Sequence, residues 1–341
     1  MKAIVYTRTG GPDVLDLVER PVPDPGPGQV RVKIHVSGVN PTDWKSRQGG
    51  SATAPAYSEQ VPNQDGSGVI DAVGDGVDPA RAGQRVWLWE TAYRRPDGTA
   101  QEYVVLPERQ AVPLPDGASF DLGASIGIPA ITAHRCLTVA DRGPGRLGPG
   151  ALSGRTVLVA GGAGAVGNAA IQLARWAGAT VVTTVSSPYK ARLATAAGAQ
   201  HTVNYRTEDA VEAVRSFAPD GVDIVVEVSP AVNAALDGAV IAPNGVVAAY
   251  ATDGGAEVVL PIRTFFVPNV RWQFVLVYTM PDVAKERAIA DVTAAVSAGA
   301  LRAGEEVGLP LHHFPLAETG KAHAAVEDHI VGKVLIDVAQ T

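Results

Sequence analysis

The residues best suited to chemistry in this chain are three glycines, Gly162, Gly164 and Gly167, which satisfy the pattern Gly-x-Gly-x-x-Gly. They follow a run of β-favouring residues at 156–160 and precede an apolar, helix-favouring segment that ends at Gly178. A strand, a glycine turn and a helix in this order suit a dinucleotide, because the backbone can approach a pyrophosphate and the helix N-terminus offers free N–H groups. The pattern therefore predicts a nucleotide-binding turn. A glycine-rich turn without a ligand is the alternative.

Each residue of this turn has an expected role. We expect Gly162 to allow the tight turn, Gly164 to let the backbone approach the pyrophosphate, and Gly167 to let helix and strand pack closely. Ala165 and Val166 lie between the last two glycines, at the start of the helix. Their N–H groups complete the predicted phosphate site.

The second strand of this region indicates which dinucleotide binds. NAD enzymes usually hold the ribose 2′-hydroxyl with an acidic residue about 20 residues after the glycine turn. Residues 183–192, TTVSSPYKAR, contain no acid, and instead supply Ser186, Ser187, Lys190 and Arg192. Hydroxyls and cations suit a 2′-phosphate, so we predict NADPH rather than NADH. The alternative is that the two cations belong to an ordinary solvated helix start.

The elements that must position these residues divide the chain into two kinds of segment. Residues 1 to about 120 contain short β-favouring runs closed by Gly, Pro or Asp. Helical spacing begins at Asp121, and strands and helices alternate from Thr156 onward. This alternation predicts an α/β domain with a doubly wound parallel sheet. The final strand resembles the β-rich N-terminal half, so we expect the C-terminus to return to the first domain.

Composition limits the function classes. A chain of 341 residues favours two domains, and its net charge of −7 gives no attraction to nucleic acid or to an anionic membrane. The apolar runs are too short for a signal peptide or a membrane span. The one cysteine, Cys136, cannot form an internal disulfide, so we expect a reducing, cytoplasmic setting.

Four motifs resemble one family, the zinc-independent medium-chain dehydrogenase/reductases, and within it the NADPH:quinone oxidoreductase (zeta-crystallin-like) group. They are SGVNPTDWKSRQG (37–49), NQDGSGVIDAVGDGV (63–77), GIPAITAHRCL (127–137) and VLVAGGAGAVGNAAIQLARWAGATVV (157–182). The resemblance implies a GroES-like β-rich substrate domain made from residues 1–124 and 300–341. It implies a Rossmann dinucleotide-binding domain at residues 125–299.

The resemblance also bears on metal. Zinc alcohol dehydrogenases of the same superfamily carry Cys where this chain has Asn40, and His-Glu where it has Gln64 and Asp65. A single cysteine cannot build their four-cysteine structural zinc lobe. A catalytic zinc needs about three ligands from Cys, His or carboxylate, and the seven histidines offer no convincing substitute. We therefore expect no metal.

By the same resemblance, a set of residues surrounds the cofactor. Those near the nicotinamide and its ribose are Asn40, Asp43 and Thr132, and those lining the same cleft are Val228, Ser229, Tyr250, Phe274, Val275, Leu276 and Val277. In the quinone reductases, a Lys at the position of Lys190 and a Tyr at that of Tyr205 line the 2′-phosphate. For Asp43 the alternative is a turn residue that holds its own backbone.

No single residue must act as an acid in quinone reduction, because the oxyanion is delocalised and can take its proton from water. Lys45, Arg47 and Tyr57 are candidates for stabilising negative charge, although Lys45 and Arg47 also suit a solvated surface. The family often has a tyrosine at the position of Lys45, which leaves the substrate shape open. Other aromatic side chains could form walls around a planar acceptor or could pack in the core. They are Trp44, Trp87, Trp89 and Tyr93.

The leading hypothesis is an NADPH-dependent reductase of quinones or similar conjugated carbonyls. The nearest alternative is enoyl or 2-alkenal reduction, which needs an acid at the α-carbon. A different class is a non-catalytic NADPH-binding structural protein. The apolar segment 270–278, VRWQFVLVY, predicts an edge strand that pairs with its twin, so we expect a homodimer.

Overall fold

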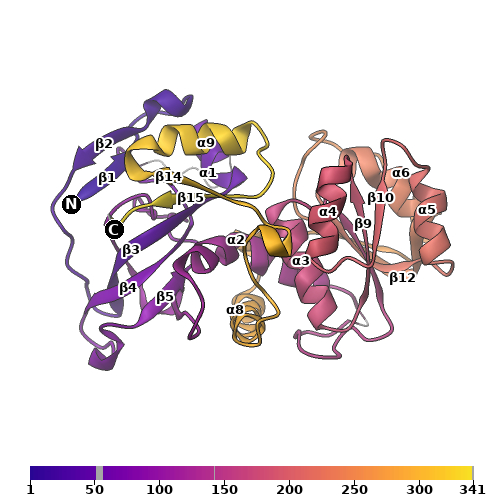
Figure 1. Ribbon diagram of the computed structural model, residues 1–341, viewed down its shortest axis with the longest axis horizontal. Coiled ribbons are helices and arrows are strands. Elements are labelled where there is room, and N and C mark those ends of the chain that lie inside the picture. The colour runs from indigo at the N-terminus through magenta and orange to yellow at the C-terminus, as the bar shows by residue number, and fades with distance from the viewer. Residues whose placement is uncertain (51–56, 142, 340–341) are drawn as a thin grey trace. The chain divides into compact units, whose positions relative to one another are not determined.

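The computed structural model describes residues 1–50, 57–141 and 143–339. The chain forms two compact units, one of Met1–Ile128 with Pro310–Thr341 and one of Pro129–Leu309. Both ends of the chain belong to the first unit, where Figure 1 shows the C-terminal strands and α9 (yellow) beside the N-terminal strands (indigo). The second unit is one continuous stretch of chain.

A seven-stranded, mostly antiparallel sheet forms the centre of the first unit. Its long strand β3 pairs antiparallel with β4, β6 and β15, so the C-terminal strand adds directly to N-terminal strands. The seven strands are β3 (Gln29–Val39), β4 (Asp65–Val73), β5 (Arg85–Leu88), β6 (Tyr103–Pro107), β7 (Ala111–Pro113), β14 (Leu311–Pro315) and β15 (Lys333–Asp337). A separate hairpin pairs β1 (Lys2–Val5) with β2 (Asp16–Glu19).

Alternation along β3 builds the core of this unit. Val30, Val32 and Ile34 point to one face and are buried together with apolar residues of the neighbouring strands. The helices α1 (Pro41–Arg47) and α9 (Thr319–Glu327) belong to this unit and pack against each other.

The second unit contains a six-stranded parallel sheet in the order β10-β9-β8-β11-β12-β13. The strands are β8 (Thr156–Ala160), β9 (Thr180–Val185), β10 (His201–Asn204), β11 (Val222–Glu227), β12 (Ile241–Ala249) and β13 (Arg271–Phe274). Every pairing in it is parallel. The chain winds outward from β8 to β10 on one side and from β11 to β13 on the other, so the strand order reverses between β8 and β11. This is the doubly wound topology. In sheets of this kind, ligands generally bind outside the carboxyl ends of the strands, at the point where the strand order reverses.

Helices cover both faces of the parallel sheet. Figure 1 shows α3 and α4 on one side of the strands and α5 and α6 on the other. The helices are α2 (Phe120–Leu137), which continues from the first unit, α3 (Ala165–Trp176), α4 (Pro188–Ala196), α5 (Ala210–Phe217), α6 (Pro230–Val240), α7 (Ile262–Phe266) and α8 (Asp282–Ser297). In the described ranges, no helix combines the length and apolar character needed to cross a bilayer. The predicted fold class, a doubly wound α/β sheet with a β-rich unit, is confirmed.

The boundaries of the units differ from the predicted residues 124 and 300. The first turns of α2 stay with the β-rich unit, because the Ile128 N–H donates to the Asp65 carboxylate at 2.8 Å. Residues up to 309 stay with the parallel sheet, because Gln172 bonds both the N–H and the C=O of Arg302. The predicted edge strand at 270–278 is also shorter in the structure, where β13 ends at Phe274.

Candidate cofactor and active site

The glycine turn lies between β8 and α3, as its pattern predicts. Its left-handed residue is Gly161, with φ +70°, rather than Gly162, so the expected role of Gly162 in the tight turn is corrected. Gly162 is small for another reason: a Cβ there would overlap the Thr183 hydroxyl of β9. At Gly167 a Cβ would overlap the Gly161 carbonyl oxygen, which matches the close packing expected there.

The start of α3 is open to a ligand. Gly164 occupies the N-cap and has no side chain to cap the helix. The first helical N–H that bonds back to the turn belongs to Asn168, which donates to the Gly164 carbonyl at 2.7 Å. The N–H groups of Ala165, Val166 and Gly167 therefore have no partner within the helix, and they add to the positive end of the helix dipole. This arrangement suits a phosphate.

The carboxyl end of β9 leads into α4 through Ser186 and Ser187. Ser187 is the N-cap of α4, and its hydroxyl accepts from the Lys190 N–H at 3.3 Å. Its side chain therefore has a structural role beside the predicted one. Ser186 and Lys190 are half-buried, and the Arg192 guanidinium lies 5.5 Å from the ring centre of Tyr189.

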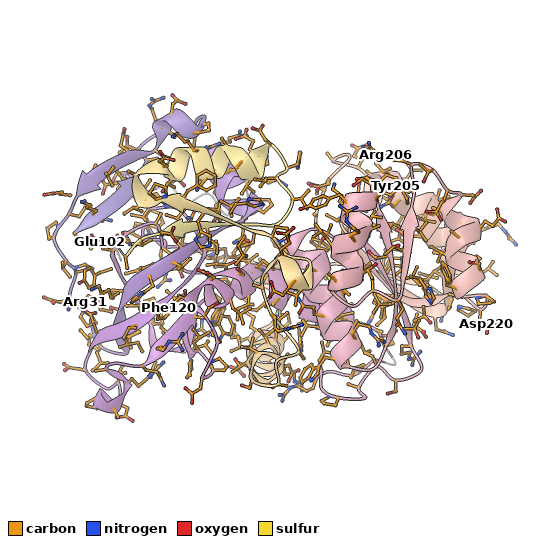
Figure 2. All side chains as sticks on the ribbon, in the orientation of Figure 1. Arg31, Glu102, Phe120, Tyr205, Arg206 and Asp220 are labelled. Atoms are coloured by element: carbon orange, nitrogen blue, oxygen red, sulfur yellow. The ribbon has the colours of Figure 1, made fainter. Side chains whose placement is uncertain are left out.

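Tyr205 reaches the same edge of the sheet from the next strand. Its N–H donates to the Val185 carbonyl at 3.2 Å, which places it beside the end of β9, and 51% of its surface is exposed. Arg206 follows it and is also exposed, and Figure 2 shows the two side chains together at this end of the unit. Sequence reasoning missed Arg206, because it lies in a turn outside any motif.

At the carboxyl end of β11, two predicted residues lie on the turn into α6. The Ser229 hydroxyl donates to the Asp253 carbonyl at 2.7 Å, and the Val228 carbonyl accepts from the Asp253 N–H at 3.3 Å. Tyr250 is tied to the same strand end, since its N–H donates to the Glu227 carbonyl at 3.0 Å. The structure therefore brings Val228, Ser229 and Tyr250 together next to the reversal of strand order.

The other predicted lining residues are spread more widely. Thr132 is buried on α2. Phe274 and Leu276 are exposed, whereas Val275 and Val277 between and after them are buried. Within this unit the side chains of Phe274 and Leu276 therefore face solvent, where a ligand or a partner could contact them.

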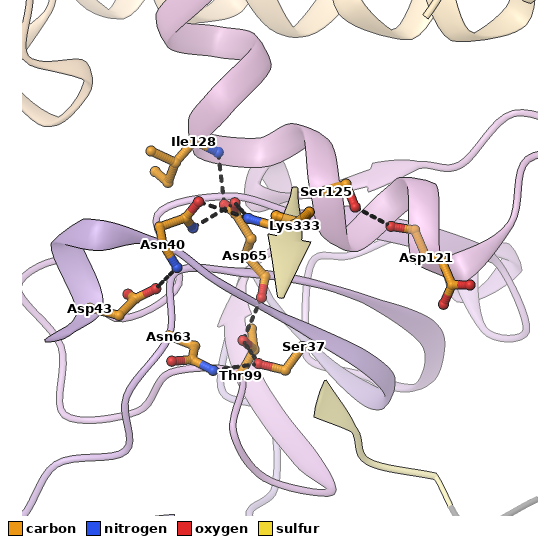
Figure 3. A network of polar contacts seen from close by, with 10 residues as sticks. All are labelled: Ser37, Asn40, Asp43, Asn63, Asp65, Thr99, Asp121, Ser125, Ile128 and Lys333. Carbon is orange, nitrogen blue, oxygen red and sulfur yellow. Dashed lines mark hydrogen bonds and ion pairs between the residues drawn. The ribbon is translucent and has the colours of Figure 1, made fainter. Parts of the chain in front are cut away.

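A buried polar cluster in the first unit contains Asn40, and Figure 3 shows its contacts. The Asn40 Nδ2 donates to Asp65 Oδ2 at 2.8 Å, and its Oδ1 accepts from Lys333 Nζ at 2.7 Å. Lys333 Nζ lies 3.4 Å from Asp65 Oδ2. Burial raises the pKa of Asp65 and lowers that of Lys333, while their mutual attraction opposes both changes. One amide group, one carboxylate and one ammonium therefore satisfy each other away from water.

Asp43 lies at the start of α1. Its Oδ2 accepts from the Asn40 N–H at 2.7 Å, so the carboxyl closes the first turn of that helix. This contact supports the alternative of a turn residue that holds its own backbone. Burial raises the pKa of Asp43 to about 8, so the carboxyl is mostly protonated at neutral pH.

A chain of hydrogen bonds supports the segment that carries Asp65. His323 Nε2 lies 2.9 Å from Asn63 Oδ1, and Asn63 Nδ2 donates to the Ser37 hydroxyl at 2.9 Å. Ser37 and Thr99 share a bond of 2.7 Å, and Thr99 donates to the Asp65 carbonyl at 2.5 Å (Figure 3). Burial lowers the pKa of His323 to about 3, so this ring is neutral and its Nε2–H donates to Asn63. This series of hydrogen bonds holds the start of β4 in place at the polar cluster.

The candidates for charge stabilisation have different surroundings. Arg47 is fully buried and pairs with Glu327 at 2.9 Å, so its expected alternative as a solvated surface residue is wrong. Lys45 is half-buried, with its ammonium 5.6 Å from the Trp44 ring centre. Tyr57 is exposed and donates its hydroxyl to the Arg94 carbonyl at 2.6 Å.

The aromatic candidates also separate. Trp87 and Trp89 are buried, which fits core packing. Trp44 and Tyr93 are half-buried.

The residues at the expected metal positions do not fit a metal ion. The cation between Asn40 and Asp65 is the Lys333 ammonium, and the Gln64 Oε1 accepts from the Ala92 N–H at 3.1 Å. In the part of the chain that the structure describes, no group of three or more His, Cys, Asp or Glu could hold a metal ion. Sequence reasoning missed Lys333. The sequence gives one indication that Lys333 is buried: it lies directly before the apolar run VLI of the final strand.

A β-rich unit built from both chain ends, together with a doubly wound sheet that carries an open glycine turn, defines the class of two-domain dehydrogenases and reductases. A profile described as the alcohol dehydrogenase GroES-like domain matches residues 26–116. A second profile, described as zinc-binding dehydrogenase, matches residues 165–294. The chain is 30% identical to human quinone oxidoreductase over 337 residues, covering 95% of this chain and 93% of that protein.

Solved structures agree with this assignment. An NAD-dependent alcohol dehydrogenase aligns with a TM-score of 0.87 and 31% identity, covering 99% of this chain and 100% of that one. A mycobacterial protein solved in complex with NADPH aligns with a TM-score of 0.81 and 29% identity, covering 98% of this chain and 99% of that one. The chain belongs to the quinone oxidoreductase-like family of medium-chain dehydrogenase/reductases, whose members are oxidoreductases that bind NAD(P). The predicted family and its GroES-like and Rossmann domains are confirmed.

Proposed function

We propose that this protein is an NADPH-dependent reductase that transfers hydride to quinones or similar conjugated carbonyls without a metal ion. The observation that carries the cofactor assignment is the carboxyl end of β9, where residues 183–192 provide hydroxyls, two cations and no acid. Tyr205 lies beside this end and leaves its side chain exposed. A 2′-phosphate requires this chemistry, whereas a free 2′-hydroxyl is usually held by an acid.

The residues of the second unit would hold the cofactor along the carboxyl edge of the sheet. The open start of α3 would bind the pyrophosphate, and Ser186, Lys190 and Tyr205 would bind the 2′-phosphate. The nicotinamide would lie at the turn after β11, with Val228, Ser229, Tyr250, Thr132 and residues 274–277 as its expected surroundings. When bound, NADPH supplies the hydride.

The cluster around Asn40 supports chemistry without metal. In zinc-dependent reduction a metal ion polarises the carbonyl oxygen, and here an ammonium occupies the space between Asn40 and Asp65. The amide of Asn40 is held by Lys333 and Asp65, which leaves one N–H of its Nδ2 for a ligand. Lys45 and Tyr57 remain proposals for stabilising developing negative charge.

The acceptor class follows from what the reaction demands. Quinone reduction places negative charge on a delocalised oxyanion that takes its proton from water, so no positioned acid is required. The relatives named quinone oxidoreductase support this acceptor.

One observation favours the second candidate, enoyl or 2-alkenal reduction. That reaction needs a proton at the α-carbon, and Asp43 has a pKa of about 8, so its carboxyl carries a proton at neutral pH. Its contact with the Asn40 N–H gives it a structural role at the start of α1, which makes it the weaker choice.

An acceptor panel tests these alternatives. NADPH oxidation is followed with 1,4-benzoquinone, 9,10-phenanthrenequinone and a 2-alkenal. Faster turnover of the quinones supports the proposal, and faster turnover of the alkenal supports the second candidate. NADPH binding without turnover of any acceptor would support the third hypothesis, a non-catalytic structural protein.

We also propose that the protein is a homodimer in the cytoplasm. β13 is an edge strand, and the exposed apolar side chains of Phe266, Val267 and Phe274 lie on or near it. The single Cys136 is buried and unpaired, which suits a reducing compartment.

A further inference from the structure

Two carboxyl side chains lie buried together in the second unit, and the proposed mechanism uses neither. Glu227 is the last residue of β11 and Asp237 lies on α6, and both are 0% exposed. The two carboxyls lie close enough for each to shift the pKa of the other. Two carboxyls in contact within a low-dielectric interior cannot both be ionised, so they share a proton.

The N–H donors around the pair show where the charge lies. Glu227 accepts from the Ser229 N–H and from Asn233 Nδ2, which lies 3.0 Å and 3.2 Å from its two oxygens. The Asp237 oxygens have no such donor among the described residues. Burial also raises the pKa of Glu227, but its hydrogen-bond donors oppose that rise, whereas burial and then the nearby charge of Glu227 raise the pKa of Asp237 well above its usual range. Asp237 therefore keeps the proton and donates its O–H, and Glu227 carries the negative charge.

The topology places this charge at the ligand-binding edge of the sheet. β11 lies next to β8, whose carboxyl end carries the glycine turn, and the strand order reverses between them. Glu227 lies at the carboxyl end of β11, one residue before Val228 and two before Ser229. The Glu227 carbonyl also accepts from the Tyr250 N–H, so the charged residue is fixed to three residues of the proposed nicotinamide surroundings.

The charge is also poorly screened. The hydrogen-bond donors to the Glu227 carboxylate, the Ser229 N–H and Asn233 Nδ2, are uncharged, and the pair is removed from solvent. A buried charge at low effective dielectric acts over several ångströms with far more effect than an exposed one.

We propose that Glu227 is an electrostatic positioning residue for the proposed hydride transfer, and that Asp237 keeps it in its charged form by holding the shared proton. In that transfer, a C–H bond of bound NADPH would break, and its hydrogen would pass with the electron pair to the acceptor. The reduced acceptor then takes a proton from water. The ring changes from neutral to positively charged, so a fixed negative charge nearby stabilises the oxidised cofactor relative to the reduced one. This inference rests on the proposed function.

The experiment compares the affinity of the full-length protein for NADP⁺ and for NADPH, each measured as a Kd by calorimetry. Glu227→Gln removes the charge and is expected to raise the ratio of the NADP⁺ Kd to the NADPH Kd by about fivefold or more. Asp237→Asn is the matched control. Its amide can still donate to Glu227, so the charge stays and the ratio should remain within about twofold of the wild-type value.

The outcomes are separable. If Glu227→Gln weakens both ligands equally, the pair is only structural and the inference is wrong. If that variant does not fold, the double variant Glu227→Gln/Asp237→Asn keeps an amide–amide hydrogen bond without the charge and is expected to show the same rise in the ratio. An unchanged ratio in a folded charge-free variant overturns the inference alone, whereas a wild-type protein that binds neither nucleotide overturns the proposed function as well.

Discussion

Lys333 and Asp65 form a buried ion pair between two strands of the β-rich unit, with Lys333 Nζ 3.4 Å from Asp65 Oδ2 and both side chains at most 1% exposed. Taking two charges out of water costs several kcal/mol for each ion, so the pair persists only because other hydrogen bonds complete it. Asn40 contacts both partners, and the Ile128 N–H donates to the second carboxylate oxygen. The pair thereby joins β4, β15, the start of α1 and the middle of α2 at one point.

Breaking this pair from one side should be strongly destabilising. Lys333→Met leaves a buried carboxylate without its cation, and the expected loss is about 3–5 kcal/mol in the free energy of unfolding. The double variant Asp65→Asn/Lys333→Met removes both charges and should recover most of that loss. Urea titration of the wild type and both variants measures the difference. Equal stability of the single and double variants would show that charge is not what holds this cluster.

The raised pKa of Asp43 predicts a pH-dependent stability. The unfolded chain loses this proton near the ordinary value of 3.8, whereas the folded protein keeps it to about pH 8. The folded state therefore binds more protons in this window, so its stability falls as the pH rises from about 4 to about 8. Asp43→Asn removes this dependence while keeping an acceptor for the Asn40 N–H.

Between pH 5 and pH 8, the wild type should lose stability relative to Asp43→Asn by about 1 kcal/mol per pH unit. Unfolding at four pH values in this range measures the slope for both proteins. If the free energy of unfolding changes with pH equally in the wild type and in Asp43→Asn, the Asp43 carboxyl is ionised in the folded protein at neutral pH.

Two glycines of the turn should respond differently to alanine. At Gly167 a Cβ would overlap the Gly161 carbonyl oxygen and lie 2.9 Å from the Gly162 Cα, so Gly167→Ala should lower both stability and NADPH affinity. At Gly164 the nearest atom to a Cβ is 3.4 Å away, so Gly164→Ala should fold normally. If a pyrophosphate approaches the backbone there, that variant should still lose at least about tenfold in NADPH affinity. Wild-type affinity in Gly164→Ala would place the phosphates elsewhere.

The exposed edge of the parallel sheet predicts self-association. Phe274 ends β13 and is 63% exposed, and Phe266 nearby is 76% exposed. Phe274→Lys places a charge on this edge and should convert a dimer into a monomer, as measured by light scattering. Leu17→Lys, on an exposed apolar residue of β2, is the control and should leave the mass unchanged. A monomeric wild type would contradict the proposed dimer.

Sequence patterns predicted the fold well because its signals are local. The strand, turn and helix at 156–176 and the alternation after it identify a doubly wound sheet without any tertiary information. The boundaries were less accurate, because they depend on long-range bonds such as that between Gln172 and Arg302.

The site was predicted only where a local pattern or a resemblance marked it. Lys333 is 268 residues from Asp65 in the chain, and nothing near either residue indicates that they meet. The pairing of Glu227 with Asp237 depends in the same way on how α6 packs against β11. The left-handed position of Gly161, one residue before the motif, shows that the pattern located the turn without assigning its conformation.

The most direct test of the proposed function is the ratio of kcat/KM for NADPH to that for NADH, with 9,10-phenanthrenequinone as acceptor and after dialysis against a chelator. We expect a ratio of at least about 10 for the wild type, because Ser186, Lys190 and Tyr205 suit a 2′-phosphate. Lys190→Glu should raise the KM for NADPH much more than that for NADH. Arg192→Glu, which makes the same charge change on the same helix, should have a smaller effect. A preference for NADH, equal effects of Lys190→Glu on both cofactors, or activity that the chelator abolishes would contradict the account.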